Sequence, residues 1–185
     1  RFRYDVYKKT EVRGFLNNDS GIDVDTYDAN SLHFGWYMAG EIKGCIRFVK
    51  PINHKDSLYA FSRLPQSERQ IAMGFMSDSI SKGLPIVELS RICIAPEMRS
   101  PILLKQFSLA IIQKLIEHNI DHALFTVFEN KSHWKQYGCE ILNGTSVWKC
   151  KVTGVPSWCM VYKKSALSGS IWESLSNQFG LKPTA

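Results

Sequence analysis

Val87-Glu88-Leu89-Ser90-Arg91-Ile92-Cys93-Ile94-Ala95-Pro96 sets a carboxylate and a guanidinium inside an apolar, β-branched run. Such a run, ended by a proline, predicts a buried β-strand. If the strand is regular, Val87, Leu89 and Arg91 lie on one face, and Glu88 with the alternate residues after it lies on the other. An unpaired buried charge costs several kcal/mol, so both side chains predict partners. The stretch alone leaves two interpretations open, an internal ion pair and a functional site.

The composition is that of a globular protein. The chain has 185 residues, of which 44% are hydrophobic, 12% aromatic and 22% charged, and this length suits one sizeable core. We therefore expect a single domain over residues 1–185. The net charge of +6 favours an acidic partner or an anionic ligand. The basic residues are dispersed, with Lys8-Lys9 and Lys163-Lys164 as the densest pairs, so we do not expect nucleic-acid binding.

The cysteines and the apolar runs bear on where the protein works. The five cysteines are odd in number, form no Cys-x-x-Cys pair and lie mostly in apolar segments, which predicts reduced core residues of a cytoplasmic protein. No apolar run approaches the roughly 18 residues of a membrane span, so we expect no stable membrane insertion. The chain begins at Arg1 rather than at a methionine, from which we expect a missing N-terminal piece.

Periodicity and turn residues predict a mixed α/β domain with a central, largely antiparallel sheet. The strand over 87–95 and the strand over 122–128 are joined by a helix, so they should be parallel, with a right-handed crossover. The other expected elements are a helix end over 1–12, a hairpin of 32–38 and 41–49, short helices in an insertion over 53–83, helices over 101–118 and 129–137, strands over 146–152 and 157–162, and an amphipathic piece, 171–179, in a C-terminal tail over 165–185.

Three features allow more than one interpretation. Asp23, Asp25 and Asp28 lie close together, but their spacing lacks the glycine and distal glutamate of a calcium loop, so we expect no metal site. Arg47 near the end of a strand favours a surface arginine whose stem covers apolar neighbours. The aromatic residues and methionines of the 53–83 insertion favour core packing over the lining of an apolar ligand tunnel.

The order of elements and several short motifs resemble the GNAT acyltransferase fold, with its acyl-homoserine-lactone (autoinducer) synthases and the related long-chain N-acyl amino acid synthases. The resemblance implies a three-layer sandwich whose central mixed, mostly antiparallel sheet is flanked by helices. Its motifs are Arg3 with Tyr7 four residues later, Asp25-Thr26-Tyr27-Asp28, Gly44-Cys45-Ile46-Arg47, Glu88-Leu89-Ser90-Arg91, and the segment from Asn130 to Tyr137-Gly138.

Two departures from the family pattern bear on the substrates. CoA-dependent GNAT enzymes cradle the CoA pyrophosphate in a glycine-rich loop, whereas the matching segment 96–103 has no glycine, and Pro101 has no N–H. The resemblance therefore implies acyl carrier protein as the acyl donor, with acyl-CoA disfavoured and no bound cofactor; an acidic carrier suits the +6 charge. The autoinducer synthases have a tryptophan where this chain reads Arg13-Gly14-Phe15, so we favour an N-acyl amino acid synthase over a synthase that uses S-adenosylmethionine.

The predicted chemistry is acyl transfer from a thioester to the amine of a small acceptor. Glu88 is the candidate general base, because a carboxylate in an apolar strand acquires the raised pKa that amine deprotonation needs. Backbone N–H groups of the strand from Ser90 through Ile92 to Ile94 would stabilise the oxyanion where that strand leaves its neighbour. By resemblance, Tyr137 would protonate the leaving thiolate.

By the same resemblance, Arg3, Asp25, Asp28, Arg47 and Arg91 would form an ion-pair network that shapes the acceptor site; structural bracing is the alternative role. Two rival functions stay open. A CoA-dependent N-acetyltransferase is disfavoured by the missing glycine loop. A non-catalytic module that binds an acyl ligand would keep its ligand after the Glu88 carboxylate is removed, whereas an enzyme would lose turnover.

Overall fold

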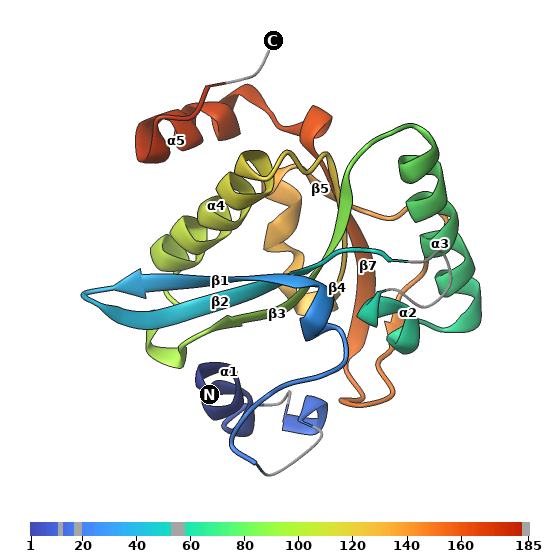
Figure 1. The fold of residues 1–185 in the computed structure, drawn as a ribbon, viewed down its shortest axis with the longest axis horizontal. Helices are drawn as coiled ribbons and strands as arrows, with labels where there is room; N and C mark the ends of the chain where they lie inside the picture. Colours follow the sequence, from blue (N-terminus) through green and yellow to red (C-terminus); the bar gives the residue numbers. More distant parts are fainter. Residues whose placement is uncertain (11–12, 17–19, 53–57, 183–185) are drawn as a thin grey trace.

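The computed structural model describes residues 1–10, 13–16, 20–52 and 58–182, with the side chains of residues 130–132 left out. Its strands form one sheet in the order β1-β2-β3-β4-β7-β5, and β6 pairs with β7 (Figure 1). Every pair is antiparallel except β3 with β4. The strands are β1 Ser31–Met38, β2 Glu41–Val49, β3 Ile86–Ile94, β4 His122–Phe128, β5 Cys139–Ile141, β6 Trp148–Lys149 and β7 Pro156–Lys163. The mixed sheet and the parallel pair confirm the predicted fold class.

Helices cover both faces of the sheet, which makes three layers (Figure 1). Helices α4 and α5 pack on one face, where Ile112 and Leu175 share a buried cluster with Leu89. On the other face, α1 covers Cys45 and Cys93, and α2 and α3 form a separate cluster with the ends of β2, β3, β4 and β7. The helices are α1 Phe2–Lys8, α2 Tyr59–Arg63, α3 Gln66–Ser81, α4 Pro101–Glu117 and α5 Gly169–Phe179, with 3-10 turns at Arg13–Phe15, Asp28–Asn30, Pro96–Met98, Glu129–Tyr137 and Lys164–Ala166.

Local sequence signals explain the best-predicted elements. Ala39 and Gly40 both have positive φ, +49° and +79°, which is the turn that joins β1 and β2 with the right twist. Helix α4 begins after Ser100, whose hydroxyl accepts a hydrogen bond from the Leu103 N–H, and Pro101 occupies its first position. Gly138 ends the turn after β4 at a φ of +75°.

The structure differs from the prediction in three segments. The strand expected over 146–152 is only β6, because the chain turns after it: Gly154 donates to the Cys150 carbonyl, 2.7 Å away. Strand β5 was not expected, since three residues are too few to show alternation. Within the 53–83 insertion, residues 53–57 lie outside the described part, and α3 is a helix of 16 residues rather than a short one.

Most apolar side chains of the insertion are core residues, as favoured above. Leu58, Phe61 and Met76 are at most 1% exposed in the cluster beneath α2 and α3. All five cysteines are buried and unpaired, which agrees with the expected reduced core residues. No described helix is long and apolar enough to span a membrane.

Strand β3 contains a bulge that the regular alternation did not predict. Ser90 pairs with Arg47 and Cys93 with Cys45, so three steps along β3 match two along β2, and Arg91 takes the extra position with a φ of +54°. The bulge turns Arg91 to the face of Glu88, where it meets Asp23 and Asp25. The expected placement of Arg91 with Val87 and Leu89 was therefore wrong. Ile92 was also misplaced, since it packs against the α4 cluster.

Gly44 provides a test of how tightly α4 packs on the sheet. A Cβ atom there would lie 2.8 Å from Phe107 Cε2, whereas a Cβ at Gly74, in the middle of α3, meets nothing within 4 Å. Gly44→Ala should lower the free energy of unfolding by about 1–3 kcal/mol. Gly74→Ala should raise it by about 0.5–1 kcal/mol, because alanine is the better helix former. Denaturant unfolding measures both, and equal effects of the two variants would contradict this packing.

Candidate active site

The parallel strands β3 and β4 separate after a short paired stretch. They pair at Ile86 with His122, Val87 with Ala123 and Glu88 with Leu124. Beyond that point β3 continues beside β2, and β4 continues beside β7. A cavity of about 490 Å³ opens in the gap and is lined by residues 88–94 of β3 and 126–128 of β4. The separation thus creates a hollow at the centre of the sheet, where binding sites of open sheets commonly lie.

The cavity reaches both layers around the sheet. On the α4 side its walls include Leu104, Phe107, Ser108, His133 and Trp134. On the side of α1 and α2 they include Val6, Tyr7, Phe15, Tyr59, Arg63, Trp148 and Cys150. Two molecules could therefore approach the gap from opposite faces of the sheet and meet beside β3.

Glu88 is the carboxylate at the point of separation. It is 2% exposed, and its Oε1 accepts a hydrogen bond from the Ala60 N–H at 3.0 Å. Its Oε2 has no hydrogen-bond partner among the described residues. Burial raises the pKa of Glu88 to about 8, against the lowering effects of the Ala60 N–H, Arg47, the Tyr59 N–H and Arg91. A carboxylate with a free oxygen and this pKa can accept a proton near neutral pH.

Arg47 is fully buried beside this carboxylate, so the expectation of a surface arginine was wrong. Its Nη1 lies 2.6 Å from Asp25 Oδ1 and 3.0 Å from Asp28 Oδ1. Its Nε donates to the Ser90 hydroxyl at 2.9 Å. Desolvation raises the pKa of Asp28, but the Asp25 N–H, which donates to Asp28 Oδ2, and the guanidinium groups of Arg47 and Arg3 together lower it below its ordinary value. Arg47 therefore joins the segment that holds Asp25 and Asp28 to strands β2 and β3.

Arg91 and Arg3 extend the same network. Arg91 Nε lies 3.0 Å from Asp23 Oδ2, and its Nη2 lies 3.0 Å from Asp25 Oδ2. Arg3, on α1, lies 3.1 Å from Asp23 and 3.5 Å from Asp28. Three guanidinium groups thus alternate with three carboxylates, which is the arrangement that low-dielectric surroundings require. The structure brings together all five network residues named by the resemblance and adds Asp23.

The free edge of β3 offers backbone donors to the gap. The Ala95 N–H donates to the Lys43 carbonyl on β2 at 2.9 Å. Because successive N–H groups of a strand point to opposite edges, those of Ile94 and Ile92 point toward the separated strand β4. Both residues line the cavity. They are therefore placed to donate to an oxyanion or to an extended ligand beside β3.

Sequence reasoning missed several cavity residues. Tyr59 lies between two cations, with the Arg63 guanidinium carbon 4.8 Å and that of Arg91 4.7 Å from its ring centroid. Arg63 also lies 5.1 Å from the ring of Phe15. Arg99 lines the cavity and donates to the Ile94 carbonyl. Neither Tyr59 nor Arg63 belongs to a motif. The one signal in the sequence that could have found them is that they are polar side chains in an otherwise apolar insertion.

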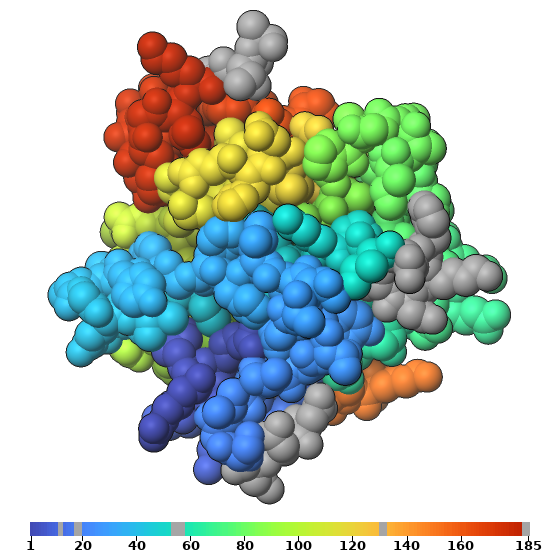
Figure 2. Space-filling view, viewed as in Figure 1, coloured from blue at the N-terminus to red at the C-terminus, as the bar shows by residue number. Residues whose placement is uncertain are grey.

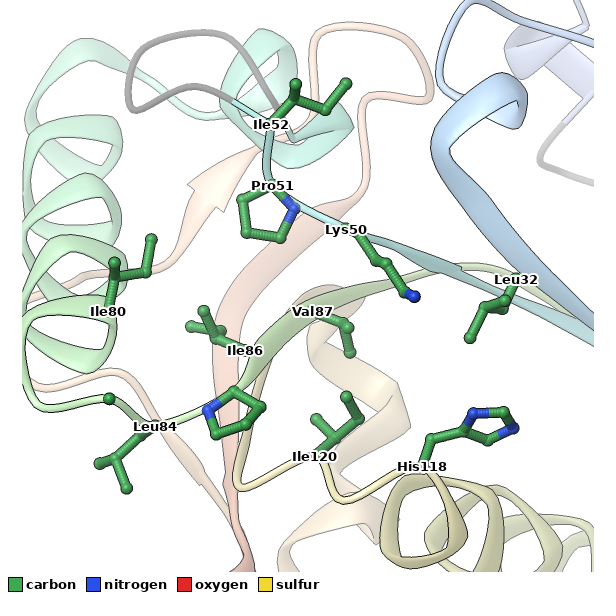
Figure 3. Close-up of a pocket in the computed structure, with 12 residues that line it drawn as sticks. Leu32, Lys50, Pro51, Ile52, Ile80, Leu84, Ile86, Val87, His118 and Ile120 are labelled. Carbon is green, nitrogen blue, oxygen red and sulfur yellow. The ribbon is translucent and has the colours of Figure 1, made fainter.

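A second, more open hollow of about 600 Å³ lies at the start of β3. Figure 3 shows Ile86 and Val87 of β3 at its centre, between Ile80 of α3 and His118 after α4. The described residues that line it include no carboxylate. We therefore take the cavity that contains Glu88 as the candidate active site.

A family model for the acetyltransferase (GNAT) domain matches residues 2–107, a stretch that holds α1, the charged network and β3. The chain belongs to the GNAT family. As a GNAT protein it is an acyltransferase. No curated protein matches the sequence significantly.

Solved structures share the GNAT fold over nearly the whole chain. A CoA-dependent acyl-homoserine lactone synthase, BjaI, has 16% identity and a TM-score of 0.63, covering 98% of this chain and 80% of its own. FeeM, an N-acyl amino acid synthase from uncultured soil microbes, has 13% identity and a TM-score of 0.59, covering 91% and 92%. The acyl-homoserine lactone synthase LasI has 16% identity and a TM-score of 0.60, covering 91% and 84%. At these identities the likeness shows the fold.

Tyr137, expected as the acid of this GNAT site, lies behind the cavity wall. It is 5% exposed and is not among the described lining residues. Burial raises its pKa, and a hydrogen bond with Ser108 opposes the rise. Ser108 lines the cavity, so a proton from Tyr137 would pass through that hydroxyl. The catalytic role of Tyr137 stays a prediction, and the side chain of Asn130, from the same motif, lies outside the described part.

The charged network predicts a large difference between two aspartates. Asp25→Asn leaves Arg47 and Arg91 each short of one buried carboxylate contact, so it should lower the free energy of unfolding by about 3–5 kcal/mol. Asp5→Asn removes an exposed pair in which Asp5 Oδ2 lies 3.8 Å from Arg1, and it should change the same quantity by less than about 0.5 kcal/mol. Urea unfolding compares them, and a small effect at Asp25 would show that the network does not hold the fold.

Proposed function

We propose that this GNAT protein transfers a fatty acyl group from an acyl carrier protein thioester to the amine of an amino acid or a related small metabolite. The observation that carries the proposal is Glu88. It lies at the separation of β3 and β4 with one carboxylate oxygen unpartnered, and its pKa is raised to about 8. An amine must lose a proton to attack a thioester, and a carboxylate of this pKa is suited to accept it.

The residues of the cavity supply each part of the reaction. Glu88 Oε2, directly or through a water, takes the proton of the attacking amine. The N–H groups of Ile92 and Ile94 donate to the thioester oxygen as it becomes an oxyanion. As the carbon–sulfur bond breaks, the thiolate takes a proton from Ser108, which is resupplied by Tyr137. The charged network holds Ser90 and Arg91 in place beneath the acceptor.

The start of α4 favours a carrier-protein donor over CoA. The Leu103 N–H donates to the Ser100 hydroxyl rather than to a ligand, and Pro101 has no N–H. A pyrophosphate would therefore find few backbone donors there. An acidic carrier also suits the net charge of +6. BjaI, which is CoA-dependent, keeps acyl-CoA as the alternative donor.

The acceptor wall favours an amino acid, with S-adenosylmethionine as the alternative. Phe15 lines the cavity in the region where the autoinducer synthases have their tryptophan, and it stacks on Arg63. A cationic sulfonium would meet the guanidinium groups of Arg63 and Arg99, which form no ion pair with a carboxylate among the described residues. An uncharged or anionic acceptor side chain fits this wall better.

Lipid analysis tests the proposal. Bacteria that express the wild-type chain should accumulate N-acyl amino acids, and Glu88→Gln should reduce them by about 10²–10⁴-fold, the range of a general base. Glutamine keeps an oxygen for the Ala60 N–H, so the fold should survive. Mass spectrometry of the extracts identifies the acceptor. Acyl-homoserine lactones instead would favour the synthase alternative, and no acylated amine from folded protein would refute amine acylation in this host.

The raised pKa of Glu88 also predicts a pH dependence. Only the ionised carboxylate accepts a proton, so kcat/KM should rise about tenfold per pH unit below pH 8 and level off above it. The rise should disappear from the residual activity of Glu88→Gln. Profiles with two acceptors of different amine pKa identify the titrating group. A midpoint that moves with the acceptor would assign the rise to the amine and remove this support for Glu88.

A further inference from the structure

Arg63 is a cation of the cavity wall without a counter-ion. It ends α2 and lies against the rings of Tyr59 and Phe15, at 4.8 and 5.1 Å from their centroids. It forms no ion pair with any carboxylate that the structure describes, and its Nε is buried without a hydrogen-bond partner. Arg63 as a whole is half-buried, but a buried N–H donor normally has an acceptor, so the position of this guanidinium favours an anionic ligand.

The other arginines of the cavity already have acceptors. Arg91 contacts Asp23 and Asp25, and Arg99 donates to the Ile94 carbonyl. Arg63 instead lies against two aromatic rings, and its Nε has no hydrogen-bond partner among the described residues. The planar edge of a guanidinium matches the two oxygens of a carboxylate.

Helix α2 also ties Arg63 to the predicted base. The Ala60 N–H in the first turn of α2 holds Glu88 Oε1, and Arg63 is the last residue of the same five-residue helix. Both Glu88 and Arg63 line the same cavity. An α-amino acid carries its amine and its carboxylate on one carbon atom, so it can present the first to Glu88 and the second to Arg63.

We propose that Arg63 binds the carboxylate of the acceptor and thereby selects carboxylate-bearing amines. The inference rests on the proposed function for the amine, but carboxylate binding can be tested without turnover. A phosphate of the donor is the other anion that could reach the cavity. If Arg63 bound that phosphate, its loss would raise the KM for the donor rather than the KM for the acceptor. Kinetics in which each substrate is varied separately therefore distinguish phosphate binding from carboxylate binding.

The first experiment is a thermodynamic cycle in which the guanidinium of Arg63 and the carboxylate of the acceptor are removed separately and together. Leucine and leucinamide are supplied as acceptors to wild type and Arg63→Leu, with a decanoyl carrier-protein thioester as donor. Loss of one charge-assisted pair should raise the KM for leucine about 10- to 100-fold. The KM of the wild type for leucinamide should exceed its KM for leucine by a similar factor. Arg63→Leu should not raise the KM for leucinamide further. Arg63→Lys should restore part of the selectivity.

Arg69→Leu is the matched control, because Arg69 lies on α3 and is not among the described lining residues of the cavity. It should leave both acceptors and the donor unchanged. If Arg63→Leu instead raises the KM for the donor, or weakens leucine and leucinamide equally, the proposal is wrong. Thermal unfolding of each variant shows whether a loss reflects misfolding.

A binding measurement separates this inference from the proposed function. Calorimetry without donor should show that wild type binds leucine more tightly than leucinamide, and that Arg63→Leu removes the difference. If no acceptor is acylated but this difference is seen, the proposed function fails and the role of Arg63 stands. If acylation occurs without any carboxylate preference, the role of Arg63 fails and the proposed function stands.

Discussion

Burial of two arginines in adjacent strands is the constraint on which the rest of the site depends. Arg47 on β2 and Arg91 on β3 are at most 6% exposed, and each needs carboxylates nearby. The segment over residues 23–28 supplies them and is thereby fixed over the sheet, although it has little regular structure of its own. In Figure 2 this blue segment lies beside the dark-blue α1, below the start of β1. Arg3 joins α1 to the same carboxylates, so this wall of the cavity rests on ion pairs as well as on the apolar contacts of Val6 and Tyr7 with the sheet.

This neutral network also explains how Glu88 retains a raised pKa beside two arginines. An unpaired guanidinium at short range stabilises a carboxylate anion and lowers its pKa. Asp25 contacts both Arg47 and Arg91, so much of their positive field is already compensated before it reaches Glu88. Desolvation then outweighs the remaining attraction, as the pKa of about 8 shows. In the proposed reaction the aspartates would thus contribute to the chemistry without touching the reacting atoms, and bracing and site formation, the alternatives left open by the sequence, would be two roles of one network.

The sequence predicted what short-range signals determine and missed what depends on contacts between distant segments. The hairpin turn at Ala39-Gly40 and the start of α4 at Pro101 follow from local chemistry. The parallel pairing of β3 and β4 follows from the helix that joins them. The bulge at Arg91 has no local signal, because it depends on the register with β2 and on carboxylates some 66 residues away. Arg47 was misassigned for the same reason, and Arg63 became a candidate only when its aromatic neighbours and its lack of a counter-ion were visible.

The bulge and the separation of the strands act together on the geometry of the site. Without the extra residue, Arg91 would point to the α4 face, into an apolar cluster that contains Leu89 and Phe107 and offers it no carboxylate among the described residues. The bulge turns the charge toward Asp23 and Asp25 and leaves Ile92 to face that cluster. The stretch of β3 along the gap therefore carries apolar side chains on the side where a fatty acyl chain would lie and charges on the side of the acceptor. A strand that divides two such environments, with N–H groups directed at the gap, would in the proposed reaction bring an apolar donor and a charged acceptor to one carboxylate.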